Sequence, residues 1–275
     1  MEQCKRGMVF VPEQSKLASG IWYGPILDKQ AIAKLKEGLV SITTERECIL
    51  SVMEILKSGD FSVKSILIGL MNSTEDEEVL NLCIRLFCSI ATNEDLLNNE
   101  NLAFLSKSSD TGVNTFAACA PTTLSYHVVP YLLVLLEEWE DIYVEQTIRD
   151  SLDSILNYTS EISEQASIDE IGEIYLDKMK KLDKGKYYYK QDAIFPGNQA
   201  KQLISQAFSA LKQSADLKMS IIPSLLSIWS GEKCPVSYNT RMNQSELEAV
   251  TKYVTILSEK EWVVGNKYFY GHRVE

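Results

Sequence analysis

The sequence predicts a mainly α-helical fold, an irregular HEAT-like stack of paired helices with a small β-hairpin or sheet formed by two tyrosine-rich segments. Apolar residues recur every three to four positions along most of the chain, as on the buried face of an amphipathic helix. N-cap signals precede several of these runs, and only 13 Gly and 7 Pro interrupt the 275 residues. We therefore expect a single α-helical domain over residues 1–275, with a sub-boundary near residues 160–196.

The firmest predictions are helices that open with an N-cap residue followed three positions later by Glu. Gly59 follows the first of these helices and is expected to end it. The four starts are Thr44 with Glu47, Thr74 with Glu77, Ser167 with Glu170, and Asn243 with Glu246.

In chain order, the periodic segments group into pairs joined by short connections, which favours antiparallel packing of neighbours. The expected helices cover residues 28–41 and 43–58, 62–72 and 74–92, 128–137 and 141–158, 167–183, 197–213 and 217–230, and 243–258, with a looser region at 93–126. Their apolar faces should form the core, including Leu70, Leu86, Phe87, Leu132, Leu135, Leu152 and Ile155.

Two of these pairs are related by a shift of 65 residues without a gap. Their apolar positions coincide, and Asp76 in the bend of one pair falls on Asp141 in the bend of the other. Such a unit, with Pro130 early in its first helix, resembles a HEAT repeat, whose period is about 40–47 residues. The longer offset predicts an insertion, and residues 93–126 are the candidate.

Two segments break the helical pattern. Residues 186–195 and 261–271 are rich in aromatic residues, and their runs KYYYK and KYFYG are similar. We expect two strands that could pair, with Gly265-Asn266 as the turn, and an added edge from residues 8–11 and 20–25.

The chain is acidic, with 38 Asp plus Glu against 27 Lys plus Arg and a net charge of −11. Binding to phosphate backbones or anionic membranes draws on Lys and Arg, so we expect no nucleic acid and no membrane as partner. A basic protein is the expected partner instead. The first residues contain no apolar segment of a secretory signal, and no run approaches the roughly 20 apolar residues of a membrane span, which predicts a cytoplasmic protein.

Carboxylates concentrate in residues 137–173, where twelve Asp and Glu accompany one base, Arg149. Such a run is either a solvated face or a docking surface for a basic protein. The adjacent tyrosines could serve as rigid binding hot spots or be buried in an aromatic hairpin. On the docking interpretation, the binding residues are Glu137, Glu138, Glu140, Asp141, Glu145, Tyr187, Tyr188 and Tyr189.

Little in the sequence supports catalysis. Motifs for phosphate loops, nucleophile elbows and zinc proteases are missing from the sequence. Of the two histidines, His127 begins an apolar helix and is expected to be structural, whereas His272 is expected at an exposed terminus. The six cysteines have no metal-ligand spacing and are expected as reduced thiols, mostly in the core. We predict no enzymatic activity, no catalytic residue, no metal and no cofactor.

The segment KYYYKQDAIFPGNQAKQLISQAF, residues 186–208, resembles a segment of a helical family of immunity proteins. The rest of the chain resembles, in its acidity and its HEAT-like body, immunity proteins of bacterial polymorphic toxin systems, including contact-dependent growth inhibition. This resemblance implies a protein that binds a cognate toxin domain, for instance a basic nuclease, and occludes its active site or substrate path. It carries over no catalytic residue. The alternative is a non-catalytic HEAT-like scaffold or adaptor for another protein.

Overall fold

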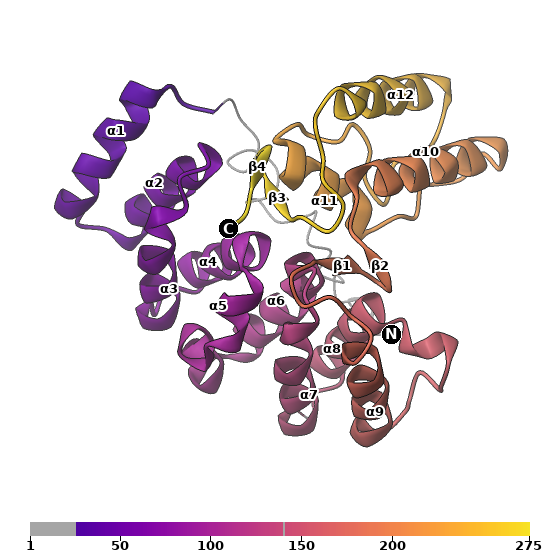
Figure 1. Cartoon of the computed structure of the whole chain (residues 1–275), viewed down its shortest axis with the longest axis horizontal. Helices are drawn as coiled ribbons and strands as arrows, with labels where there is room; N and C mark the ends of the chain where they lie inside the picture. The colour runs from indigo at the N-terminus through magenta and orange to yellow at the C-terminus, as the bar shows by residue number, and fades with distance from the viewer. Residues whose placement is uncertain (1–25, 140) are drawn as a thin grey trace, which may run out of the picture.

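The computed structural model describes residues 26–139 and 141–275, and within them the chain is mainly α-helical (Figure 1). Its strands there are two short antiparallel pairs. The mainly α fold predicted from the sequence is therefore confirmed. The edge expected from residues 8–11 and 20–25 lies outside the described residues.

The first two thirds of the chain form a stack of helices that winds from α1 to α9 (Figure 1). Short 3-10 turns, labelled η, join several of the helices. The elements are α1 (Lys29–Gly38), η2 (Leu39–Ser41), α2 (Glu45–Lys57), η3 (Phe61–Val63), α3 (Lys64–Ser73), α4 (Glu77–Ile90), α5 (Asn93–Leu97), η4 (Asn99–Lys107), α6 (Asp110–Cys119), η5 (Ala120–Thr123), η6 (Tyr126–Val128), α7 (Val129–Glu138), α8 (Ile142–Leu156), η7 (Tyr158–Ser160) and α9 (Ile168–Met179).

The second helices of successive pairs repeat at a regular distance. Helices α2, α4, α6 and α8 begin at Glu45, Glu77, Asp110 and Ile142, so their starts are 32, 33 and 32 residues apart. Each packs on the next, α2 on α4, α4 on α6 and α6 on α8. The shift of 65 residues therefore spans two repeats. Its period is shorter than the 40–47 residues typical of HEAT repeats.

The prediction that residues 93–126 are an insertion is wrong. This region holds α5, η4 and α6, and η4 packs on α3 while α6 packs between α4 and α8. It is the repeat between the two pairs that the sequence comparison aligned. Its first half is a 3-10 helix with a non-helical residue at Leu102, which breaks the helical period on which the comparison relied.

Three of the four predicted helix starts are confirmed by their capping contacts. The Thr44 and Asn243 side chains accept the first free amides of α2 and α12, and Ser167 with Glu170 forms a complete capping box. The start at Thr74 is wrong, because Asp76 caps α4 by accepting from the amides of Glu78 and Val79. Gly59, with φ +82°, follows the end of α2 as expected.

The last third of the chain forms a second group of helices around its own core (Figure 1). Two-residue strands make a hairpin before it and another at the C-terminus. The elements are β1 (Tyr188–Tyr189), β2 (Asp192–Ala193), α10 (Pro196–Lys212), α11 (Ile221–Ser230), α12 (Gln244–Ser258), β3 (Tyr268–Phe269) and β4 (His272–Arg273).

The tyrosine-rich segments form hairpins, but they do not pair with each other as strands. Strand β1 pairs with β2 and β3 pairs with β4, with turns at Lys190 and Tyr270, both at positive φ. Gly265 is not in a hairpin turn. Its amide donates to the carbonyl of Ile194 and its carbonyl accepts from the amide of Tyr187, which connects the two hairpin segments.

The C-terminal hairpin lies between the two helical groups (Figure 1). Phe269 and Tyr270 belong to the core of the helical stack, whereas Tyr268 belongs to the second core. The Lys267 side chain, only 1% exposed, donates to the carbonyl oxygens of Cys88 (2.8 Å), Ala91 (3.0 Å) and Thr123 (3.2 Å). It thereby satisfies carbonyls at the end of α4 and in η5 that the helices leave free.

Of the seven predicted core residues, all but Leu70 are buried. Leu70 is half-buried on α3, because that helix lies on the outside of the stack and packs against the core by only one face.

Candidate protein-binding surface

The bends that precede α2, α4, α6 and α8 lie along one edge of the stack. Contacts between bends show that they are neighbours: Arg46 pairs with Glu78 at 2.7 Å, Thr74 donates to Glu45, and Ser109 donates to Glu77 at 3.1 Å. We name this the bend edge and define it as residues 44–47, 74–78, 108–110, 137–139 and 141–143.

The bend edge is acidic. Within these ranges Arg46 is the single base. The edge carries exposed carboxylates from all four bends, namely Glu45, Glu47, Glu75, Asp76, Glu77, Glu78, Asp110, Glu137, Glu138 and Asp141. Part of this acidity has a structural reason, because carboxylates are favourable near the amino ends of helices. The regular stacking nevertheless gathers carboxylates that are widely separated in the sequence into one row.

The predicted acidic residues fall at the fourth bend. Glu137 and Glu138 are exposed at the end of α7 and make no ion pair within the described part of the chain. Asp141 is also exposed, but its carboxylate caps α8 by accepting from the amides of Tyr143 and Val144. Glu145 is half-buried and pairs with Arg149 at 2.8 Å. Glu140 lies outside the described residues.

The three predicted tyrosines lie in and beside β1, and their side chains are largely used by the fold. Tyr187 is 8% exposed in the second core, and burial raises its pKa to about 12. Tyr188 accepts from the amide of Asp183, and Tyr189 is half-buried against the second core, where desolvation raises its pKa. The buried aromatic hairpin considered from the sequence describes them better than an exposed hot spot.

Sequence reasoning missed two apolar side chains at the fourth bend. Ile142 and Tyr143, the first residues of α8, are 72% and 79% exposed. Val134, on the preceding helix, is 51% exposed. The amphipathic pattern of α8 could have indicated the pair, because both residues fall outside the apolar stripe of Val144, Ile148 and Leu152.

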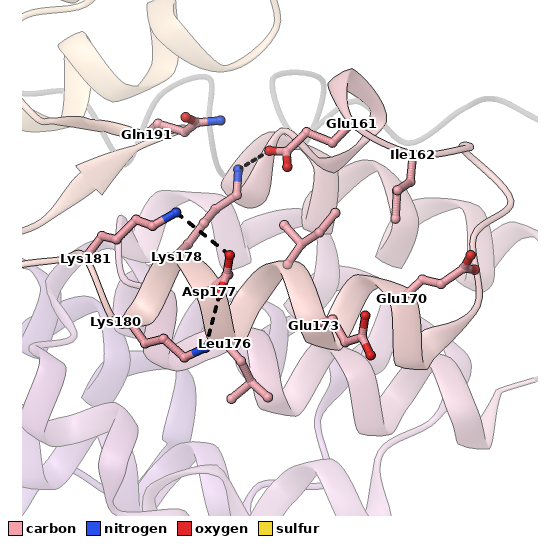
Figure 2. A pocket seen from close by; sticks show the side chains of 11 residues that line it. Glu161, Ile162, Glu170, Glu173, Leu176, Asp177, Lys178, Lys180, Lys181 and Gln191 are labelled. Atoms are coloured by element: carbon pink, nitrogen blue, oxygen red, sulfur yellow. Dashed lines mark hydrogen bonds and ion pairs between the residues drawn. The ribbon is translucent and has the colours of Figure 1, made fainter.

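The remainder of the acidic window lies elsewhere, along a hollow of about 730 Å³ beside α9 (Figure 2). Glu161 pairs there with Lys178 at 3.0 Å, and Asp177 is close to both Lys180 (3.1 Å) and Lys181 (3.8 Å). Glu170 is engaged in the capping box with Ser167. The hollow thus mixes both signs of charge, so the one-sided acidity of the sequence window belongs to the bend edge.

Titratable groups in the described residues form no acid–base couple with a nucleophile. Burial lowers the pKa of His127, and Lys184 lowers it further. His272, expected at an exposed terminus, is half-buried in β4 over Gly59, and burial lowers its pKa as well. The thiols of Cys83, Cys88 and Cys119 are free and buried, and desolvation raises their pKa values.

In the part of the chain that the structure describes, no three His, Cys, Asp or Glu side chains gather into a group that could hold a metal ion. Over the same residues, no helix is both long and apolar enough to cross a bilayer.

Comparison with protein families gives one match. The family described as immunity protein 47, Imm47, matches residues 17–274, which is nearly the whole chain. Neither the curated proteins nor the solved structures contain a significant match to it.

Proposed function

The chain belongs to the immunity protein 47 family, and from this premise we propose that it binds a cognate toxin domain and neutralises it by occluding the active site or the substrate path. The observation that carries the proposal is the family match over residues 17–274. Neutralisation by binding needs a surface rather than a catalytic centre. On this proposal the protein acts without catalysis, in the cytoplasm of the cell that makes the toxin.

We further propose that the bend edge attracts the toxin electrostatically. A row of exposed carboxylates with one base raises the local concentration of a basic partner and speeds its association. Many enzymes that cleave nucleic acids need a basic face to hold phosphates. A basic nuclease domain is therefore the toxin class that fits the charge of this edge best.

The test uses the toxin domain encoded directly upstream of the gene for this chain as the probe. Glu137→Lys with Glu138→Lys changes the charge of the fourth bend without touching the cap at Asp141. The matched control, Glu259→Lys with Glu261→Lys, makes the same change in net charge at exposed positions after α12. We expect the first variant to associate several-fold more slowly at low salt, and the control to associate nearly as fast as the unaltered protein.

Salt separates attraction from other causes. Because the Debye length falls from about 10 Å at 0.1 M to about 3 Å at 1 M, the difference between the two variants should shrink as salt is added. Equal association rates at low salt would remove the bend edge from the proposal. Failure of the unaltered protein to bind the toxin domain and to protect cells that express it would refute the immunity function itself. A scaffold or adaptor, which the helical stack would also suit, predicts that failure.

A further inference from the structure

The fourth bend differs from the other three at the first two positions of its helix. These positions hold Glu45-Arg46 in α2, Glu77-Glu78 in α4 and Asp110-Thr111 in α6, all of them polar. In α8 they hold Ile142 and Tyr143. Since the four helices start at a regular period and pack on one another, these are equivalent places in one repeating structure.

The polar residues at the other bends have structural roles that the apolar pair lacks. Glu45 accepts from Thr74, Arg46 pairs with Glu78, and Glu77 accepts from Ser109, so each joins one bend to the next. Tyr143 contributes its backbone to α8, yet its hydroxyl has no hydrogen-bond partner within the described residues. Packing does not account for the pair either, because most of each side chain is exposed to solvent.

Exposed Ile and Tyr side by side cost solvation free energy unless a partner covers them. Around them lie the exposed carboxylates of Glu137, Glu138 and Asp141. An aromatic and an aliphatic anchor within a charged rim is the composition of a binding hot spot, in which the apolar centre supplies most of the affinity.

We propose that Ile142 and Tyr143 are the anchor residues for the toxin, which presents an apolar pocket bordered by Lys or Arg side chains. This inference rests on the proposed immunity function and refines it. Charge complementarity between the acidic bend edge and a basic domain identifies the occupant. The carboxylates then govern the association rate, and the apolar pair governs the dissociation rate.

The experiment measures both rates for Ile142→Ala with Tyr143→Ala, again with the toxin domain encoded directly upstream. Ala at these exposed positions preserves the α8 cap, because Asp141 bonds to backbone amides. The matched control is Val263→Ala with Val264→Ala, a second pair of adjacent exposed apolar residues, 58% and 54% exposed, located between α12 and β3. Thermal unfolding of both variants checks that the fold is kept.

We expect the α8 variant to dissociate about 30-fold faster or more, which corresponds to about 2 kcal/mol, while its association rate stays within about threefold. The control should dissociate like the unaltered protein. An unchanged dissociation rate in the α8 variant, with the unaltered protein still binding, would overturn this inference and leave the immunity function standing. If the unaltered protein does not bind the toxin, both are overturned. The inference is also overturned if the pair instead holds two copies of this chain together, seen as a dimer that the α8 variant dissolves.

Discussion

Replacing the buried lysine of the C-terminal hairpin should change how the stability of the protein depends on pH. Lys267 donates to three carbonyl oxygens and has only 1% of its surface exposed. Burial lowers its pKa to about 7, an effect that Lys64 reinforces and that Cys88 and Asp95 oppose. The perturbation is Lys267→Met, which keeps the length of the side chain but removes the titrating group and its hydrogen bonds.

The sign of the pH dependence follows from which state binds the proton. Between pH 7 and the ordinary pKa of 10.5, unfolded lysine is protonated whereas folded Lys267 has largely lost its proton. The free energy of unfolding therefore rises with pH in this window, at up to about 1.4 kcal/mol per pH unit. With a folded pKa of about 7, the gain from pH 7 to pH 8.5 amounts to about 1.6 kcal/mol. Well below pH 7, both states carry the proton and Lys267 contributes no slope.

Urea unfolding followed by circular dichroism at pH 7 and pH 8.5 measures this difference. The unaltered protein should gain about 1.6 kcal/mol, and Lys267→Met should lack this gain. The variant should also lose about 2–4 kcal/mol at pH 7, because three carbonyls lose their donor. Lys260→Met, which removes a single bond to the carbonyl of Ser230, is the control and should keep the pH-dependent gain. The same pH slope in Lys267→Met and the unaltered protein would refute the assignment.

Two further predictions concern local structure. Gly59→Ala should cost about 1–3 kcal/mol, because Gly59 has φ +82° and an added Cβ would lie 2.5 Å from the His272 ring, whereas Gly38→Ala in α1 meets no atom within 4 Å and should be neutral or stabilising; urea unfolding of the pair checks this, and equal effects would contradict it. Ser167→Ala removes one half of the capping box with Glu170 and should lower the stability by about 1 kcal/mol, measured in the same way, and an unchanged midpoint would show that the cap is not needed.

Helices with a strong apolar period were predictable from the sequence, and the irregular ones were not. Helix α4 has ten consecutive buried or nearly buried positions framed by acidic residues, so its pattern is unambiguous. Helix α6 contains Gly112, Thr115 and Asn114 among its apolar residues, and its helical propensity is low. It is helical because α4 and α8 pack on both sides of it. Tertiary packing therefore determines the one repeat that the sequence comparison took for an insertion.

The hairpins show a second limit of sequence reasoning. KYYYK and KYFYG are similar enough to suggest two strands of one sheet, and each instead folds back on itself through a residue at positive φ, Lys190 and Tyr270. Neither is a residue type that marks a turn, so local preference gave no warning. The amides of Tyr270 and Gly271 donate to the carbonyls of Ile228 and Trp229 at the end of α11, and these long-range bonds hold the turn.

For the candidate surface, the sequence revealed the charge but not its arrangement. A window along the chain counts Glu137 and Glu161 together, yet the fold places the first on the bend edge and pairs the second with Lys178. Conversely, Glu45 and Glu77 belong to one acidic row although they are 32 residues apart. Only the regular period of the stack relates them, and that period was hidden by the 3-10 helix η4.

The same period identifies the residues that most deserve mutation. A repeat supplies its own reference, because residues at equivalent positions face similar surroundings and should be chosen for similar reasons. Carboxylates at the start of α2, α4 and α6 agree with this rule, since they favour helix amino ends and connect adjacent bends. Ile142 and Tyr143 break it at a cost in solvation, and a partner that covers them supplies the compensation that the fold does not. The argument for the binding site therefore comes from the difference between one repeat and the other three, and charge alone could not have located it.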